Sequence, residues 1–481
     1  MKRPAYLFIA MVAALSAAIL LSLAAQSNIR ASAVPVGGVS QFEGTPQHIY
    51  NVDYTFPPLN TTVSGSIVVA PTVYHGMLIV DLSSMNHSLA SGYVAAIDLE
   101  TGGVVWKDML PNQFMTQPIA ANGLVIIGVG NNELNFSNPN ATNSLLHVVR
   151  GTGINYIAAI NPANGKLVWR FNTTGADMPT PLYYEGRVIE ATGGGYAYAL
   201  NSSNGDVIWA TSLFVMPYNM IHTQLNVSAN PNVPGFFDSM SSPVLLDGIV
   251  YFGVSDPGVF YAINATTGKI IWDTRFPGAV GGTGGTSAAI YAPANIIVTG
   301  YAGPRSYKSS AAVQPSNSFS VAASQNKAVQ PDKFISPVIV GLNMDNGNII
   351  WSYTEIPRAQ PLSPPIEIDP ITIWNATAFS DSPSAGILYT FNVSTGAVLW
   401  SFRTGIDASN PNVFGGYLFL DSSNGTVFTL HLNGTLVSEH NLGVPMGPGE
   451  PVVIGDKLLL YGTNGMIKTV PLAYLENRSY R

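Results

Sequence analysis

The sequence predicts an all-β fold, a closed ring of eight four-stranded antiparallel units that forms an eight-bladed β-propeller. Three observations support this prediction. One hairpin pattern recurs six times at fixed offsets, a second hairpin precedes most copies, and the composition is typical of short strands joined by turns. The 481 residues include 47 glycines and 34 prolines, and only 10% of them are charged, against roughly 25% in an average soluble protein.

The recurring pattern is a strand, a turn that begins at Asp or Asn, and a second strand that ends on Trp. A glycine lies four residues before each Trp, and an apolar residue lies nine before it. An Asp or Asn side chain starts a turn, and Gly supplies the φ > 0 position of a short hairpin loop with a bulge. The tryptophans of the six copies are Trp106, Trp169, Trp209, Trp272, Trp351 and Trp400.

A second hairpin lies upstream of most copies, so each unit has four strands, here named A to D. Two further units, which start at Asn410 and Pro448, are degenerate, and the last has three strands before the chain ends. We expect the missing strand to come from residues 47–56, which belong to no other unit, and to close the ring. The tight A–B turns are clearest at Asn122-Gly123, Glu185-Gly186 and Asp247-Gly248.

The pattern A-[I/L]-[D/N]-x-x-x-G-x-x-x-W resembles the tryptophan-docking repeat of the pyrroloquinoline quinone (PQQ)-like β-propellers, and it covers roughly residues 48–475. The resemblance is specific for the fold but not for the function, because one fold hosts many different sites. We therefore expect residues 47–476 to form the propeller, preceded by a linker at 27–46 and followed by a short tail at 477–481.

The first 26 residues predict export. Lys2 and Arg3 precede an uncharged apolar segment at residues 4–25, which is long enough to span a bilayer of roughly 30 Å. By the positive-inside rule the rest of the chain lies outside the cytoplasm. The segment is either a retained transmembrane anchor or a signal peptide, for which Ala31-Ser32-Ala33 offers a cleavage site. The protein is thus expected to be secreted or anchored at the cell surface.

Sequons for N-glycosylation agree with export without proving it. The candidate acceptors are Asn60, Asn86, Asn135, Asn140, Asn172, Asn226 and Asn375.

The two faces of the ring differ in loop length. The A–B and C–D turns lie on one face and are short, so we call it the short-turn face. The B–C loops and the D–A connections lie on the opposite, long-loop face. Long loops in compact domains are usually functional or lack regular structure, so we expect the functional site on the long-loop face near the axis. The insertions there are the B–C loops 83–92, 130–155, 302–334 and 375–386 and the D–A connections 212–239 and 357–365.

Several kinds of chemistry are excluded or disfavoured. The chain has no cysteine, which excludes disulfides, thiolate metal sites and cysteine nucleophiles. The sequence contains no HExxH, EF-hand, phosphate-loop or G-x-S-x-G motif. The net charge is only −7 and no basic run exists, so nucleic acid is not an expected partner.

The resemblance to PQQ-like propellers implies three alternative roles. Quinoprotein dehydrogenases of this fold hold the quinone over a vicinal cysteine pair and use a bound calcium, so a chain without cysteine disfavours this role. We therefore expect no cofactor and no metal. Membrane-anchored assembly scaffolds bind partner proteins through their loops, and the N-terminal segment is compatible with this role.

The third role is that of the exported tetrathionate hydrolases of acid-loving microbes, which look like PQQ-type propellers without the quinone. A chain with only 27 acidic and 20 basic residues fits an acid environment. Each paired carboxylate loses its stabilising interaction when it is protonated, so a chain with few carboxylates loses little stability as the pH falls. Our first interpretation is therefore an acid-stable hydrolase of a sulfur oxyanion. The second is a scaffold that binds partner proteins, and an oligomer is compatible with either.

A hydrolase of a dianion requires basic groups to position the substrate and a carboxylic acid to transfer a proton. Asp238 is the first candidate acid, because its aromatic neighbours could raise its pKa by desolvation. Asp256, Asp332 and Asp381 are weaker candidates. The candidate substrate-binding residues on the long-loop face are Arg150, Arg305, Lys308, Arg358 and His222.

Overall fold

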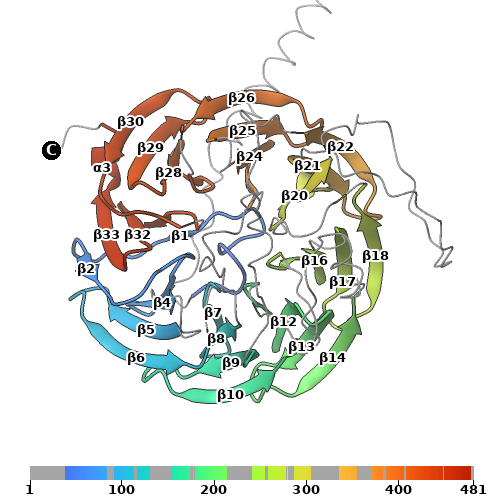
Figure 1. Cartoon of the computed structure of the whole chain (residues 1–481), viewed down its shortest axis with the longest axis horizontal. Coiled ribbons are helices and arrows are strands. Elements are labelled where there is room, and N and C mark those ends of the chain that lie inside the picture. Colours follow the sequence, from blue (N-terminus) through green and yellow to red (C-terminus); the bar gives the residue numbers. More distant parts are fainter. Residues whose placement is uncertain are drawn as a thin grey trace, which may run out of the picture.

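The structure, a computed structural model, shows eight sheets arranged around a central axis (Figure 1). Seven sheets have four strands each and the eighth has five. The predicted eight-bladed propeller of antiparallel blades is therefore confirmed. The structure describes residues 38–83, 92–112, 116–130, 154–173, 177, 179–213, 241–254, 258–277, 279, 287–304, 335–354, 370–382, 386–405, 408–447 and 449–477.

The first four blades follow one another in chain order, with strand A innermost and strand D at the rim (Figure 1). Blade 1 contains β3 (Thr72–Tyr74), β4 (Met77–Ser83), β5 (Gly92–Asp98) and β6 (Val104–Leu110). Blade 2 contains β7 (Ile119–Ala121), β8 (Leu124–Val129), β9 (Tyr156–Ile160) and β10 (Leu167–Asn172). Blade 3 contains β11 (Leu182–Tyr184), β12 (Arg187–Thr192), β13 (Tyr196–Asn201) and β14 (Val207–Ser212). Blade 4 contains β15 (Val244–Leu246), β16 (Ile249–Val254), β17 (Val259–Asn264) and β18 (Ile270–Arg275).

The next three blades continue the ring. Blade 5 contains β19 (Ala289–Tyr291), the short 3-10 helix η2 (Ala292–Ala294), β20 (Ile296–Pro304), β21 (Ile335–Asn343) and β22 (Ile349–Thr354). Blade 6 contains β23 (Thr372–Trp374), β24 (Thr377–Ser382), β25 (Ile387–Asn392) and β26 (Val398–Arg403). Blade 7 contains β27 (Asn412–Phe414), β28 (Tyr417–Leu420), β29 (Thr426–His431) and β30 (Leu436–Asn441).

Blade 8 closes the ring by combining the two ends of the propeller. Its C-terminal strands are β31 (Val452–Ile454), β32 (Lys457–Tyr461) and β33 (Met466–Pro471), and the helix α3 (Leu472–Leu475) follows. The outer fourth strand is β2 (Asn60–Thr62), antiparallel to β33. The predicted closing segment 47–56 instead supplies β1 (Asn51–Val52), a fifth strand that pairs in parallel with the inner edge of β31. Pro57 and Pro58, which cannot donate to a strand ladder, separate these two strands.

Each repeat tryptophan docks on the turn of the following blade. The Nε1–H of Trp209 donates to the carbonyl of Ala265 at 3.0 Å, and Ala265 follows the turn residue Asn264. The other five tryptophans make the same bond at 2.7 to 3.1 Å, to the carbonyls of Pro162, Ser202, Met344, Val393 and Leu432. The degenerate blade 7 thus still accepts the tryptophan of blade 6, at Leu432.

The repeat glycine is required both by the turn and by the docked indole. Gly268 has φ +71°, and a Cβ on it would lie 2.6 Å from Cδ2 of Trp209. Asn264 completes the turn, because its Oδ1 accepts the backbone N–H groups of Thr266 and Thr267. Each repeat therefore supplies both halves of the contact: its Asn and Gly receive the tryptophan of the preceding blade, and its own Trp docks on the following blade.

The hydrophobic core lies between neighbouring blades. One cluster joins Ile189 and Ala199 of blade 3 to Phe252 and Tyr261 of blade 4. Strands B and C are buried on both faces, which explains their nearly continuous apolar sequences.

One predicted loop was wrong in its bounds. Residues 375–386 were expected to form a B–C loop, but Thr377–Ser382 is the buried strand β24. Asn375, with φ 51°, belongs to the short A–B turn. The turn was missed because Asn-Ala replaces the usual Gly, and the strand was missed because its sequence, TAFSDS, is largely polar. Asp381 therefore lies in a buried strand rather than in a loop.

Within the described ranges, no helix is long and apolar enough to cross a membrane. The predicted anchor or signal peptide at residues 1–26 lies outside these ranges.

Candidate functional site at the propeller axis

Residues 38–52, which we call the axial segment, fill the centre of the ring (Figure 1). Except in blade 8, where β1 of this segment pairs with β31, strand A has an inner edge without a neighbouring strand, and its buried N–H groups need acceptors. The second residue of strand A donates to the axial segment in one blade after another. The bonds run from Ala120 to Val39 O (2.6 Å), Tyr183 to Ser40 O (2.7 Å), Ile290 to Pro46 O (2.7 Å), Ile373 to Gln47 O (2.9 Å) and Val453 to Tyr50 O (3.2 Å).

Side chains of the axial segment reach the remaining blades. Gln41 Oε1 accepts the N–H of Leu245 at 3.0 Å, and the hydroxyl of Tyr50 accepts the N–H of Val73 at 2.8 Å. Asn51 Nδ2 donates to the carbonyl of Val413 at 3.0 Å. One segment of 15 residues, 38–52, therefore contacts the innermost strand of every blade. The sequence predicted a linker at residues 27–46, and the structure places residues 38–46 of it on the axis.

A ring of buried polar residues, the polar ring, lies just before strand A of six blades. Its side chains link neighbouring blades: Thr180 Oγ1 accepts the backbone N–H of Gln117 at 3.0 Å, and Ser242 Oγ accepts that of Thr180 at 3.0 Å. Ser287 Oγ accepts the N–H of Ser242 at 3.1 Å. The members of the polar ring are Gln117, Thr180, Ser242, Ser287, Asn410 and Glu450.

The sequence carried a signal for the polar ring that the repeat pattern did not use. Five of its members precede a proline, in Gln117-Pro118, Thr180-Pro181, Ser242-Pro243, Asn410-Pro411 and Glu450-Pro451. Proline at the start of a strand needs no ladder hydrogen bond, and it holds the preceding residue extended. Because the D–A connection precedes strand A, the polar ring lies toward the long-loop face.

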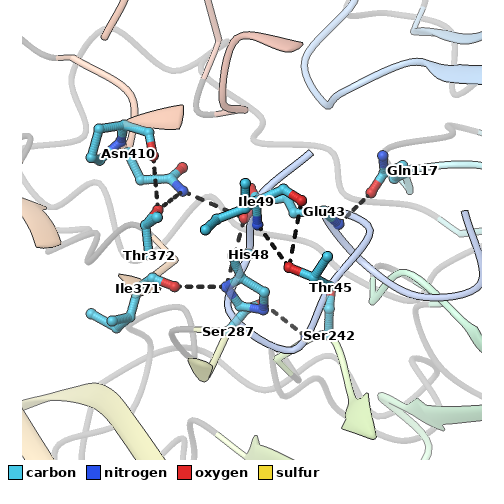
Figure 2. A network of polar contacts seen from close by, with 11 residues as sticks. Glu43, Thr45, His48, Ile49, Gln117, Ser242, Ser287, Ile371, Thr372 and Asn410 are labelled. Atoms are coloured by element: carbon cyan, nitrogen blue, oxygen red, sulfur yellow. Dashed lines mark hydrogen bonds and ion pairs between the residues drawn. The ribbon is translucent and has the colours of Figure 1, made fainter. Parts of the chain in front are cut away.

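The axial segment meets the polar ring at Glu43 and His48 (Figure 2). The backbone N–H of Glu43 donates to Gln117 Oε1 at 2.7 Å. The side-chain Oε2 of Glu43 accepts a hydrogen bond from Asn410 Nδ2 at 3.4 Å. His48 Nδ1 lies 2.8 Å from the carbonyl of Ile371, which makes this nitrogen a donor. The same Nδ1 is 3.6 Å from Glu43 Oε2.

Four fully buried carboxyl groups, whose charges all act on the buried Tyr461, form an acidic cluster: Glu43, Asp81, Asp421 and Glu450. Burial raises the pKa of all four well above its usual range, and that of Asp421 rises to about 8. Glu43 and Asp421 raise the pKa of Glu450 further by charge repulsion. In the described part of the chain, the ion pairs that use Lys or Arg lie elsewhere, at Arg187–Glu185 and Lys457–Asp456. The carboxyls are therefore neutral acids at acid pH.

His48 is the base inside this cluster. Burial lowers the pKa of His48 to about 4, although its bond to the carbonyl of Ile371 opposes the shift. The imidazole is therefore neutral over most of the range in which the carboxyls are protonated, and Glu43 and His48 form a contact between two neutral groups.

A second buried carboxyl pair lies between blades 2 and 3. Burial raises the pKa of both Asp177 and Glu190, and the nearby charge of Asp177 raises the pKa of Glu190 further because like charges repel. Thr173 Oγ1 donates to Asp177 Oδ2. Strongly shifted carboxyl groups are candidates for proton transfer, but both are at most 1% exposed and cannot touch a substrate in this arrangement.

All eight predicted catalytic and substrate-binding residues lie outside the described residues, so their predicted roles stay predictions. They are Asp238, Asp256, Asp332, Arg150, Arg305, Lys308, Arg358 and His222. Of the predicted glycan acceptors, Asn60, Asn172 and Asn375 are exposed, and Asn86, Asn135, Asn140 and Asn226 lie outside the described residues.

The cysteine-free sequence and the described residues do not supply the donors of a quinone and calcium site. The cysteine pair that supports the quinone in dehydrogenases of this fold has no counterpart, since the sequence has no cysteine. Among the residues with described positions, no group of three His, Asp or Glu side chains is arranged to hold a metal. We therefore derive no reaction step through either group.

The described residues thus form the packed centre of the propeller, which is only part of a complete functional site. The axial segment and the polar ring close the centre of the propeller, and the polar ring faces the side from which the long connections emerge.

Comparisons with known proteins complete the description. A family model described as "Outer membrane protein assembly factor BamB" (PQQ_2) matches residues 153–219 and 229–443. The tetrathionate hydrolase of Acidithiobacillus ferrooxidans is 23% identical over 435 residues, 85% of this chain and 74% of that protein. The tetrathionate hydrolase of Acidianus ambivalens is 23% identical over 402 residues, 80% of this chain and 68% of that protein. The crystal structure of BamB from Moraxella catarrhalis is similar in fold, with a TM-score of 0.53 at 16% identity over 85% of this chain and 99% of that one.

Proposed function

The chain belongs to the PQQ_2 family of propellers, and from its distant relationship to tetrathionate hydrolases we propose that it hydrolyses a sulfur oxyanion such as tetrathionate. The observation that carries the proposal is the length of the match, which spans 85% of this chain and 74% of one hydrolase. A shared fold alone would not support an activity. We further propose that the enzyme works outside the cytoplasm, at acid pH and without a bound quinone.

The buried acids support the part of the proposal that concerns pH. A carboxyl whose folded pKa lies above its unfolded value stabilises the fold below the unfolded pKa. That stability is lost as the pH rises toward the folded pKa. Asp421, with an ordinary value of 3.8 and a folded value of about 8, therefore favours the fold most strongly below about pH 4. Such groups suit a protein that has to remain folded in acid.

The reaction needs water, basic side chains that bind the dianion, and an acid that transfers a proton. It needs no redox cofactor. Addition of one water to tetrathionate gives thiosulfate, sulfate, one sulfur atom and two protons, so that atoms and charge balance. We propose that basic groups of the long-loop face bind the dianion, namely Arg150, Arg305, Lys308, Arg358 and His222. Asp238, or else Asp256 or Asp332, would transfer the proton as an S–S or S–O bond breaks.

The test is release of thiosulfate and sulfate from tetrathionate by the purified protein between about pH 2 and 5. Asp238→Asn is expected to lower kcat at least about 100-fold if Asp238 is the proton-transfer group. Asp247→Asn is the matched control, because Asp247 is an exposed residue of an A–B turn on the short-turn face. Absence of turnover by correctly folded protein in this pH range would refute the proposed activity.

A scaffold function is the second candidate, and the name of the family model favours it, since it describes an assembly factor. In this case the long-loop face would bind a partner protein and the N-terminal segment would hold the propeller at a membrane. Cell fractionation together with the mass of the mature N-terminus tests export and distinguishes an anchor from a cleaved signal. A folded protein that fails to hydrolyse tetrathionate but retains a specific partner, lost on substitution of long-loop residues, would support the scaffold.

A further inference from the structure

The axial segment contacts all eight blades. Its contacts with strands A are hydrogen bonds to backbone groups, the N–H groups of seven strands and the carbonyl of Val413 in blade 7, and none of them depends on the identity of the strand's side chain. When the segment is in place, these N–H groups are buried and paired. When it leaves, the inner edges of the blades become accessible to water together.

The acidic cluster is built from several elements that meet at this segment. Glu43 and His48 belong to the axial segment itself. Glu450 precedes β31, Asp421 follows β28, and Asp81 lies in β4. The polar groups that face Glu43 are Gln117 Oε1, Asn410 Nδ2 and His48 Nδ1.

Tyrosine residues complete the surroundings of the cluster. The hydroxyl of Tyr461 donates to the carbonyl of Glu450 at 2.7 Å, and the charges of Glu43, Asp81, Asp421 and Glu450 all act on this tyrosine. Tyr50, on the axial segment, is influenced by Glu450. Among the described groups, the only base that contacts the cluster is His48. Ionisation would therefore place like charges together without a balancing cation.

We propose that the axial segment is a pH-sensitive latch, which closes the ring of blades while the acidic cluster is protonated and opens as the cluster ionises. In the open state Glu43 leaves with the segment, and water reaches Glu450 and Asp421. The latch does not depend on the proposed hydrolase activity, because every contact that forms it is made within the described chain.

The expected size of the effect follows from proton linkage. A carboxyl that is protonated in the closed state and ionised in the open state increases the opening constant tenfold per pH unit. His48 acts in the opposite direction below pH 6.5, because in the open state it regains a proton that its burial excludes. Between pH 6.5 and about 7.5 His48 is neutral in both states, so the carboxyls act alone.

Amide hydrogen exchange measures this opening on the full-length protein. The reporters are the N–H groups of Ala120, Tyr183, Ile290 and Ile373, each of which donates to an axial carbonyl. After correction for intrinsic exchange, their opening constant should rise at least tenfold per pH unit from pH 6.5 to about 7.5. Amides of the rim strand β14 provide the internal reference and should not follow this dependence.

Substitution of Glu43 tests the assignment. Glu43→Gln mimics the protonated acid. The rise of the opening constant with pH should therefore weaken by a factor of about ten per pH unit, and the segment should stay closed at higher pH. Glu185→Gln is the matched control, since Glu185 is an exposed turn residue of the short-turn face. His48→Asn should leave the opening constant above pH 6.5 unchanged. Below pH 6.5 the opening constant should rise more steeply with pH than in the wild-type protein.

Two results would overturn the proposal. One is an opening constant that does not change with pH while circular dichroism shows a folded propeller. The other is a Glu43→Gln variant whose pH dependence equals that of the wild-type protein and of Glu185→Gln.

Discussion

The rim and the axis of the propeller are held together in different ways. At the rim, one contact is repeated six times: an indole N–H donates to a turn carbonyl above a glycine. At the axis, one segment contacts every blade, and it uses backbone carbonyls for some blades and side chains for others. The rim therefore repeats, whereas the axis does not.

The two regions also differ in charge. The docking turns pair amides with carbonyls and contain no buried acid, so their strength should depend little on pH. The axis contains four buried carboxyls with raised pKa values. The rim therefore stabilises the ring through a repeated contact between neighbouring blades, whereas the proposed latch makes closure at the axis depend on protonation.

The largest expected effect is loss of a docked indole. Trp169 is only 7% exposed and packs between blades 2 and 3. Trp169→Ala is expected to lower the free energy of unfolding by about 3–5 kcal/mol, because it removes a large buried side chain. Urea denaturation measures this change. Trp169→Phe, which loses the N–H but retains a ring, should cost less, and equal losses would contradict the docking geometry.

A smaller effect is expected from the glycine beneath the same indole. Gly205 has φ +76°, and an added Cβ would lie 2.7 Å from Cε3 of Trp169. Gly186 has φ +79° with nothing within 4 Å of the added Cβ, so Gly186→Ala measures the backbone cost alone. Gly205→Ala should exceed it by about 1–3 kcal/mol in the free energy of unfolding. If the two variants unfold at the same urea concentration, the docked indole of Trp169 does not require a glycine at position 205.

The third prediction separates the axis from the rim by pH. Burial raises the pKa of Asp421 to about 8, so its contribution to stability is full below its unfolded value and is lost as the pH rises toward 8. Asp421→Asn removes the titrating group. Between pH 5 and 7 the free energy of unfolding of the variant should therefore decrease with pH less steeply than that of the wild-type protein, by about 1.4 kcal/mol per pH unit. Denaturation at several pH values tests it. The same pH dependence in wild type and variant would contradict a buried neutral acid, and Asp247→Asn serves as the exposed control.

Much of the rim could be predicted from the sequence because its repeat pattern is local. Asn264, Gly268 and Trp272 lie within nine residues and recur at the same spacing, although each tryptophan docks on the turn of the following blade. The closing strand was only partly predicted. Which of two short N-terminal segments takes the outer position depends on Pro57 and Pro58 and on the length of chain needed to leave the axis.

The candidate site could not be predicted in the same way. Glu43 and Asn410 are 367 residues apart, and no local pattern relates them. The prolines that follow five members of the polar ring were visible in the sequence, but only the closed ring brings those residues into one circle. The long-loop residues chosen for substrate binding rest on loop length and residue type, and they stay predictions.

The sequence by itself determined the repeat, the number of blades and the face that carries the long connections, because each follows from strand periodicity and short turns. The tertiary structure alone decided that the axial segment fills the centre and that Glu43, Asp421 and Glu450 share one buried environment. The physical reason is that the unpaired inner edges of eight blades and the desolvation of an acid arise only when the ring closes.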